Sequence, residues 1–354
     1  MNFSAGASYI DPSILDRLDT GLMQQSHRDP GGPVQTVLVE AQTRVRRLLS
    51  VPDNYHVLLM HGGAHAQFSA IPLNLNASKI GYVNTGQWSR KFADEASKFC
   101  EVKEVAWSTT RFPYEDEWDC SEDLGIVHVC ANETMAGIEM HHDPDSRHTL
   151  VADFTSTLMS RAVDVSRYGV IYASAGKNLG TPGFCVVIAR RDIVAEVPDS
   201  VPSVLSWKVA AGTLPVQNIH NTPPILPIQI SNDVLGMYID KGGVAHYRDR
   251  AARLSGLVYA CVNGSGGFYR NRVSDCSKSL MNVVFELYNH DLLQSFLGEA
   301  ESRGLHQLRN HPMAAAGVRV TVYNMIPDDY FHALVDFMEE FRGKHGARAP
   351  VAPV

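Results

Sequence analysis

The feature that most limits the fold of this sequence is a series of short, almost wholly apolar segments separated by helix-like ones. The apolar segments are Val57–Met60, Ile80–Val83, Val102–Trp107, Ile126–Cys130, Thr149–Ala152, Val170–Tyr172 and Phe184–Ala189. Strands that are apolar along their whole length are buried on both faces, and helices between parallel strands provide the cover. The sequence therefore predicts an α/β fold with a mostly parallel sheet covered by helices, which include 35–50, 64–76 and 88–99.

The regular alternation of apolar strands and helices ends at about residue 200. The proline-rich segment Asn221–Pro227 is expected to be an extended loop, because consecutive prolines exclude a helix. The elements expected beyond it are helices at 228–241, 244–262, 290–303 and 327–343 and strands at 281–287 and 318–323. We therefore predict a large domain over 12–241, a smaller α+β domain over 242–345 joined by 1–11, and a flexible tail over 346–354.

Composition and charge exclude several classes of protein. The chain has 31 Lys and Arg against 38 Asp and Glu, a formal charge of −7, so nucleic acid is not an expected partner. No apolar run approaches the roughly 20 residues of a membrane helix, and the first residues do not have the pattern of a signal peptide. We therefore expect neither a membrane partner nor secretion, and favour a cytoplasmic protein.

Cysteines and histidines give no metal motif. The six cysteines include no C-x-x-C pair, and reduced thiols are expected. His141 and His142 lie near Asp143, Asp145 and His148, but they lack the helical spacing of a good ligand set. No metal site is predicted.

Two residues at the ends of predicted strands carry the clearest chemical signal. Asp153 ends one apolar strand, and Lys177 follows another in the small-residue segment Ala173–Gly180. A lysine in such a place can bond to an aldehyde cofactor, and a carboxylate beside it can hold the ring nitrogen of pyridoxal phosphate protonated. Either residue alone would be read as a turn cap or a solvated loop lysine, whereas together they favour a cofactor site.

Two further features are weaker on their own. His61–Phe68 places a glycine turn before a helix, whose free N–H groups suit a phosphate. Taken alone, however, the segment is better explained as a plain tight turn between a strand and a helix. It is neither a P-loop nor a dinucleotide-binding turn. Trp88 follows the second strand and could stack on a flat heterocycle or simply anchor a helix in the core.

Together these residues resemble the phosphoserine aminotransferase family, class V aminotransferases of the fold type I pyridoxal-phosphate (PLP) enzymes. Segments that resemble family blocks, in the family's order, are Asn2–Gly6, Ser26–Arg28, Gly62–Phe68, Asn132–Thr134, Asp153–Thr157, Ser160–Arg161, Asp164–Tyr172, Lys177–Asn178, Asn221–Pro224, Phe268–Asn271, Met281–Asn282 and Tyr323–Asn324. The resemblance runs from the first residues to about Gly343. It implies a large cofactor-binding domain, a small domain and a homodimer with shared active sites.

The resemblance also implies a cofactor site. Lys177 is expected to bind the PLP aldehyde and move a proton, and Asp153 to pair with the ring nitrogen. Trp88 would stack on the ring, and Thr134 would bond near the ring hydroxyl. The cofactor phosphate would be held by the backbone N–H groups of Ala64 and His65 and, from the neighbouring subunit, by Asn221 and Thr222.

Four residues would bind the substrates by the same resemblance. Arg319 would bind the α-carboxylate through a bidentate guanidinium, while His27, Arg28 and His311 would face the distal phosphate. Because unperturbed histidines lose their charge near pH 6.5, phosphorylated substrates are expected to bind more weakly from pH 6.5 to 8.5.

Departures from the family pattern concentrate around the two phosphates. Gly176 replaces a glutamine, and Pro312 stands where an arginine is expected after His311, with one extra residue before Arg319. His65 occupies a position at which some relatives have arginine, and Ala7 replaces a proline. Each lost charge-assisted contact to a phosphate is worth about 1.5–3 kcal/mol, so substrate affinity is expected to fall.

The function that the resemblance implies is transfer of an amino group between glutamate and a small 2-oxo acid with a distal anion. The first candidate acceptor is 3-phosphohydroxypyruvate, giving phosphoserine for serine biosynthesis. The departures leave open a transaminase adapted to a phosphonate, a sulfonate or a non-phosphorylated 2-oxo acid. A PLP lyase or decarboxylase, and a catalytically silent protein of the same fold, are further alternatives; Lys177, Asp153 and Arg319 argue against the last.

Overall fold

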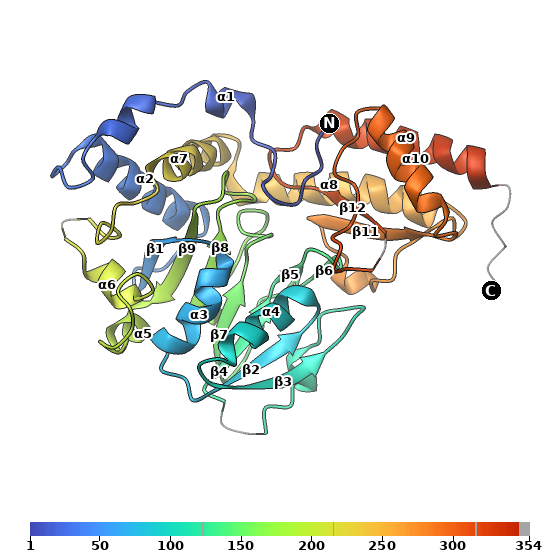
Figure 1. Cartoon of the computed structure of the whole chain (residues 1–354). Helices are drawn as coiled ribbons and strands as arrows, with labels where there is room; N and C mark the ends of the chain where they lie inside the picture. The colour runs from blue at the N-terminus through green and yellow to red at the C-terminus, as the bar shows by residue number, and fades with distance from the viewer. Residues whose placement is uncertain (122–123, 215, 316, 347–354) are drawn as a thin grey trace.

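The computed structural model describes residues 1–121, 124–214, 216–315 and 317–346. Two lobes lie side by side in Figure 1, a larger one built on a seven-stranded sheet and a smaller one containing the C-terminal helices. The tail prediction concerns 346–354, of which only Gly346 lies inside the described residues.

The large sheet follows the predicted strands closely. Its members, in the order in which they pair, are β1 (Tyr55–His61), β9 (Phe184–Arg190), β8 (Val170–Ser174), β7 (Thr149–Asp153), β4 (Ile126–Cys130), β2 (Lys79–Asn84) and β3 (Glu101–Trp107). Pairing is parallel from β8 to β3 and antiparallel where β9 meets β8 and β1. The predicted α/β class and the mostly parallel sheet are confirmed.

Helices cover this sheet on both faces and form part of the small lobe. Their bounds are α1 (Pro12–Leu15), α2 (Pro33–Leu48), α3 (Ala64–Asn74), α4 (Gln87–Ala96), α5 (Arg191–Ala195), α6 (Trp207–Gly212), α7 (Ile225–Asp240), α8 (Gly243–Asn263), α9 (Leu292–Ser302) and α10 (Asp328–His345). Short 3₁₀ turns occur at η1 (Thr20–Gln24), η2 (Glu115–Glu117), η3 (Val165–Arg167) and η4 (Asp275–Ser277). Among the described residues, no helix is long and apolar enough to cross a membrane.

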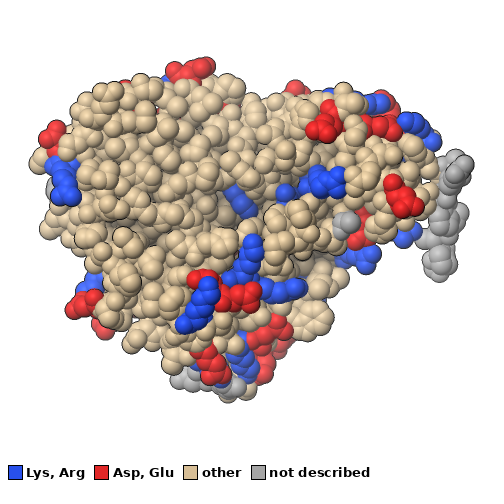
Figure 2. All heavy atoms as spheres, in the orientation of Figure 1, with Lys and Arg blue, Asp and Glu red and all other residues tan. Residues whose placement is uncertain are grey.

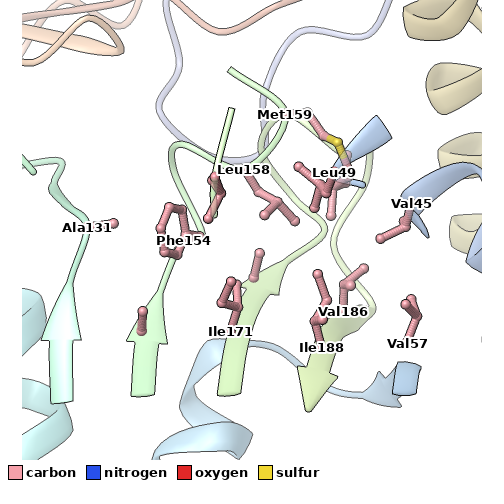
Figure 3. Close-up of a cluster of buried hydrophobic side chains, with 14 of the residues drawn as sticks. Val45, Leu49, Val57, Ala131, Phe154, Leu158, Met159, Ile171, Val186 and Ile188 are labelled. Carbon is pink, nitrogen blue, oxygen red and sulfur yellow. The ribbon is translucent and has the colours of Figure 1, made fainter. Parts of the chain in front are cut away.

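The alternation of side chains along the strands divides the core of the large lobe into two layers. On β8, Ile171 and Ala173 pack in a cluster with α2 and α7, whereas Val170 and Tyr172 pack in a cluster with α3 and α4. Figure 3 shows part of the first cluster, with Ile171 among the side chains that fill it. Since both faces are covered mainly by apolar groups, side chains that meet a ligand are expected at the strand ends.

The small lobe is built on the three-stranded sheet β10 (Tyr269–Arg270), β11 (Asn282–Leu287) and β12 (Val318–Thr321), packed against α8, α9 and α10. The N-terminal segment joins it: the N–H of Phe3 donates to the carbonyl of His306 at 3.1 Å, and Phe3 is fully buried in the same cluster. A separate two-stranded hairpin, β5 (Asn132–Glu133) with β6 (Ile138–Glu139), lies next to the site described below.

Two details differ from the sequence-based expectations. The segment Asn221–Pro227 is not wholly extended, because α7 already begins at Ile225. Pro227 lies in the first turn of α7, where the missing N–H has no helical partner to lose. The change from one hydrophobic cluster to the other occurs inside α8, between Tyr247 and Ala251, rather than at the Gly242–Gly243 turn. The domain boundary at 241–242 therefore stays a proposal.

The buried layer between the sheet and α2 generates a stability prediction. Ile171→Ala removes a side chain that is 1% exposed, and we expect a loss of about 2–5 kcal/mol in the free energy of unfolding. Urea denaturation followed by circular dichroism measures it. Val39→Ala on α2, where the side chain is 45% exposed, is the matched control and should change stability by less than about 0.5 kcal/mol. Equal losses would show that this layer is not tightly packed.

Candidate active site

A cavity of about 180 Å³ opens where the C-terminal ends of β4, β7 and β8 meet the N-terminus of α3. Six residues proposed from the sequence line it, namely Ala64, His65, Trp88, Thr134, Asp153 and Lys177. They come from five separate segments of the large lobe. The parallel sheet brings these segments together because the carboxyl ends of its strands meet at one edge.

Lys177 lies in the loop that follows β8, with its amine inside the cavity. Its Nζ donates to Oγ1 of Thr134 at 3.0 Å and lies 5.7 Å from the centroid of the Trp88 ring. The Tyr323 ring, from the small lobe, lies 5.9 Å from the same nitrogen. The amine is therefore held between aromatic rings and a hydroxyl, in a position to meet a carbonyl carbon.

Asp153 is the last residue of β7 and is 6% exposed. Burial raises the pKa of its carboxyl group, while hydrogen bonds from Thr155, the charge of Lys177 and a hydrogen bond from Tyr172 act in the opposite direction. The N–H of Thr155 donates to Oδ1 at 2.8 Å. A buried carboxylate of this kind is suited to pair with a protonated ring nitrogen.

The N-terminus of α3 provides a cradle for an anion. Gly63 caps the helix without a side-chain hydrogen bond, so the N–H groups of Ala64 and His65 point outward uncapped. A Cβ added at Gly63 would lie 3.3 Å from Oγ of Ser174, so the glycine keeps the turn close to that hydroxyl. Thr155 also lines the cavity, and its Oγ1 accepts from the N–H of Ser174 at 3.1 Å.

Trp88 lies in the first turn of α4 and is held there by Glu133. The Glu133 carboxylate accepts from the N–H groups of Trp88 at 3.0 Å and of Ser89 at 2.8 Å, and so caps α4. A Cβ at Gly86 would lie 2.9 Å from this carboxylate, so glycine is required. Within the described part of the chain, the buried Nε1 of Trp88 has no hydrogen-bond partner.

The small lobe supplies a second group of polar residues. Arg319, on β12, has a buried Nε without a partner among the described residues, and burial lowers the pKa of its guanidinium. Burial also lowers the pKa of His311, and the charges of Arg319 and Lys91 add to this effect. Figure 2 shows Lys and Arg side chains around a hollow in the middle of this face.

A wider cleft of about 330 Å³ opens nearby, between α4 and the small-lobe sheet. It is lined by Arg90 from α4, by Met135, which follows Thr134, and by Asn310, which precedes His311. The amide Nδ2 of Asn310 donates to the carbonyl of Met135 at 3.0 Å. This bond joins the loop carrying His311 to the hairpin beside the lysine.

Six of the proposed residues do not line this cavity. Two of them, His311 and Arg319, belong to the small lobe described above, and the other four belong to the large lobe. Arg28, Asn221 and Thr222 are exposed, and His27 is half-buried with its carbonyl accepting from Gln35. Figure 1 shows the segment between η1 and α2 at the end of the large lobe remote from β11 and β12. Any role of His27 and Arg28 beside His311 therefore requires a second subunit.

The sequence analysis missed several polar residues of the cavity wall. Thr155 and Ser174 stand beside the α3 cradle, while Asn132 and Ser156 form a buried pair in which Nδ2 of Asn132 donates to Oγ of Ser156 at 2.8 Å. Thr155 lies two residues beyond Asp153, and Ser174 ends β8. Their positions after strand ends were the available signal.

The structure also bears on the departure at Gly176. A Cβ at this position would lie 3.2 Å from Cβ of Pro182, which is closer than ordinary van der Waals contact. The carbonyl of Gly176 accepts from the N–H of Ser8 at 3.1 Å, so the loop is also held from the N-terminal side. Glycine at 176 therefore fits the proline at 182.

The residues present fit PLP as a bound group. The cavity combines a lysine amine, a buried carboxylate and uncapped N–H groups, which match the aldehyde, ring nitrogen and phosphate of that cofactor. The unpaired Nε1 of Trp88 and the aromatic walls suit a flat ring.

Comparison with known proteins finds relatives along almost the whole chain. The curated phosphoserine aminotransferase of Geobacillus kaustophilus is 38% identical over 96% of this chain and 98% of its own length. A solved phosphoserine aminotransferase from Bacillus circulans subsp. alkalophilus superimposes with a TM-score of 0.92 at 34% identity, over 97% of this chain and 98% of that one. A PLP-bound phosphoserine aminotransferase from Trichomonas vaginalis gives 0.88 at 30% identity, over 95% and 99%.

The profile of the aminotransferase class-V family matches residues 1–323. This match covers the large lobe, the lysine loop and the strand that carries Arg319. On this evidence, together with the two-lobed fold and the PLP-type cavity, the chain belongs to the class-V aminotransferases, within the group of phosphoserine aminotransferases.

Proposed function

We propose that this protein is a PLP-dependent phosphoserine aminotransferase that moves an amino group between glutamate and 3-phosphohydroxypyruvate. The observation that carries the proposal is the convergence of Lys177, Asp153 and the uncapped N-terminus of α3 on one cavity. The 38% identity to a phosphoserine aminotransferase over almost the whole chain supports the substrate. The proposed place of the reaction is serine biosynthesis, in the cytoplasm.

Each protein group has a defined task in this proposal. When bound, PLP supplies an electron sink that stabilises negative charge at the substrate α-carbon. Lys177 would hold the cofactor and carry a proton to and from that carbon, and Asp153 would keep the ring nitrogen protonated. Trp88 would pack against the ring and exclude water, and Thr134 orients the lysine amine through the 3.0 Å hydrogen bond.

Substrate binding is proposed to use both subunits of a homodimer. Arg319 would bind the α-carboxylate, and its half-buried guanidinium, with an Nε that is unpaired in the described structure, supports this role. The cavity of their own chain is not lined by Arg28, His27, Asn221 or Thr222. In a dimer with shared active sites these four residues would serve the partner's site.

The departures around the distal phosphate favour one alternative. Pro312 supplies no charge, and His65 replaces a possible arginine at the mouth of the cavity. A transaminase with a different anionic or uncharged acceptor has the same cofactor site. After loading with glutamate, comparison of kcat/KM for 3-phosphohydroxypyruvate, sulfopyruvate, phosphonopyruvate and pyruvate decides between them.

Covalent capture tests the cofactor assignment. We expect the purified protein with PLP to absorb visible light and to retain the cofactor after borohydride reduction, with the label on the peptide that contains Lys177. Lys177→Ala should lose the reducible attachment, because Lys177 is the lysine among the described residues that line the cavity. Mass spectrometry of the digested protein measures this, and a label on a different lysine would reject the assignment.

Subunit mixing tests the shared site. Lys177→Ala inactivates the site of the subunit that carries it. Arg28→Ala is expected to weaken the binding of phosphorylated acceptors ten-fold or more by loss of a charge-assisted bond. If Arg28 serves the partner, mixed dimers contain one intact site, and random mixing restores about a quarter of wild-type activity. Assays at low acceptor concentration, before and after subunit exchange, measure it. No recovery in verified mixed dimers would place Arg28 and Lys177 in the same subunit's site.

The lowered pKa of His311 generates a pH prediction. Burial, Arg319 and Lys91 all disfavour the imidazolium, so the proton leaves below the ordinary value of about 6.5. We therefore expect His311→Asn to raise KM for the phosphorylated acceptor several-fold at pH 5.5 and only slightly at pH 8. His311 is therefore expected to lose its charge at a lower pH than the range of 6.5 to 8.5 expected from the sequence. A larger effect at pH 8 than at pH 5.5 would contradict it.

A further inference from the structure

Three polar residues, Asp153, Tyr172 and His128, lie on the same face of neighbouring strands, behind the cofactor cavity. Asp153 on β7 is the register partner of Tyr172 on β8 and of Cys130 on β4. His128 precedes Cys130 by two residues and so points to the same face. This face is otherwise the apolar layer beneath α3 and α4. A histidine and a tyrosine hydroxyl in that layer need a physical reason, because burial of polar groups costs free energy unless they are paired.

The contacts connect the three residues in a line. Nε2 of His128 lies 2.8 Å from the Tyr172 hydroxyl, and both residues are buried. Tyr172 is the register partner of Asp153 across β8 and β7, and a hydrogen bond from its side chain contributes to lowering the pKa of the Asp153 carboxyl group. The imidazole of His128 stacks on the Phe92 ring, with centroids 3.5 Å apart and planes within 9°. On its other side, the buried Nδ1 of His128 has no partner among the described residues.

The number of protons fixes the direction of these bonds. An ionised Asp153 only accepts, so the Tyr172 hydroxyl must donate to it. That hydroxyl has a single proton, so His128 must donate from Nε2 to the Tyr172 oxygen. The ring then leaves Nδ1 as a bare acceptor, whereas the opposite direction would bury an Nδ1–H without a partner. Burial also keeps the imidazole neutral by lowering its pKa to about 3.

We propose that His128 and Tyr172 are positioning residues that form a one-way hydrogen-bond relay, from His128 Nε2–H through the Tyr172 hydroxyl to the carboxylate of Asp153. The relay keeps that carboxylate ionised and turned into the cavity. It rests on the proposal that Asp153 faces the ring nitrogen of PLP, and it extends that contact two residues into the core.

The other groups around Asp153 show why such a relay is useful. The charge of Lys177 and the hydrogen bonds from Thr155 and Tyr172 lower the pKa of Asp153 and so oppose the effect of burial. The charge of Asp153 also raises the pKa of three buried neighbours, Glu133, Cys130 and Cys185. Once the lysine amine is committed to the cofactor, Tyr172 and Thr155 remain to favour the ionised form.

The test reads the protonation of the cofactor ring directly. PLP labelled with ¹⁵N at the ring nitrogen is bound to the wild-type protein and to Tyr172→Phe and His128→Leu, and its NMR shift is followed against pH. We expect the ring nitrogen to lose its proton at a lower pH in both variants, and the PLP dissociation constant to rise about ten-fold in Tyr172→Phe. His128→Gln retains an N–H donor and should stay close to the wild type.

Two controls separate this effect from general damage to the core. Tyr55→Phe also removes a buried hydroxyl hydrogen bond, 2.7 Å to the Tyr168 carbonyl on the same sheet, and should leave the ring-nitrogen shift unchanged. Asp153→Asn should abolish protonation of the ring nitrogen. If Asp153→Asn leaves the protonation of the ring nitrogen unchanged, the proposed contact between Asp153 and the cofactor is wrong. If Asp153→Asn abolishes that protonation but Tyr172→Phe and His128→Leu leave it unchanged, as Tyr55→Phe does, the relay is wrong.

A measurement on the unmutated holoenzyme covers variants that do not fold. With ¹⁵N-labelled histidine, His128 should give the signals of a neutral ring protonated on Nε2 from pH 6 to pH 8.5. A ring protonated on Nδ1, or one that titrates in this range, would overturn the proposal.

Discussion

Burial of the large sheet on both faces is the constraint on which the rest of this molecule depends. With apolar clusters against α2 and α7 on one side and α3 and α4 on the other, the strands have no exposed face on which to place polar groups. Their carboxyl ends are the available sites, and Asp153 and the Lys177 loop occupy them. The same burial gives these groups their strength, because charges interact more strongly where water is excluded.

The fold was largely predictable because its strongest signals are local. Strands such as Ile126–Cys130 are continuous apolar runs, and the amphipathic stretch before Leu48 has helical spacing. What the sequence left uncertain depends on tertiary context. Pro227 was taken as a helix breaker, although the first turn of α7 accepts it. The antiparallel direction of β9 could not be predicted, because a buried strand has the same apolar sequence pattern in either direction.

The sequence also indicated most of the residues that line the candidate cavity, since Asp153, Lys177 and the glycine turn each lie at or just after a strand end. The residues behind the cavity wall, such as Glu133 and His128, could not be predicted from the sequence. Glu133 caps α4 through backbone N–H groups 44 and 45 residues away in the chain, and His128 reads as one polar residue inside an apolar strand. Such contacts are set by the register between strands, which single-sequence patterns do not contain. The roles proposed for His27 and Arg28 depend on a second subunit, which neither the sequence pattern nor a single chain describes.

The pairing of the chain's first residues with the small lobe has a consequence for synthesis on the ribosome. The Met1 amine and the carbonyl of Gly304 that it contacts are separated by 303 residues, and Phe3 lies between side chains of α10 and its neighbours. The segment that contains Phe3 is translated before α8, α9 and α10, so its aromatic side chain stays uncovered until these helices have left the ribosome. The sheet of the large lobe can assemble during that interval. Vectorial folding thus leaves the closing of the N-terminal strap, whose Ser8 touches the lysine loop, as a late event in the maturation of the active site.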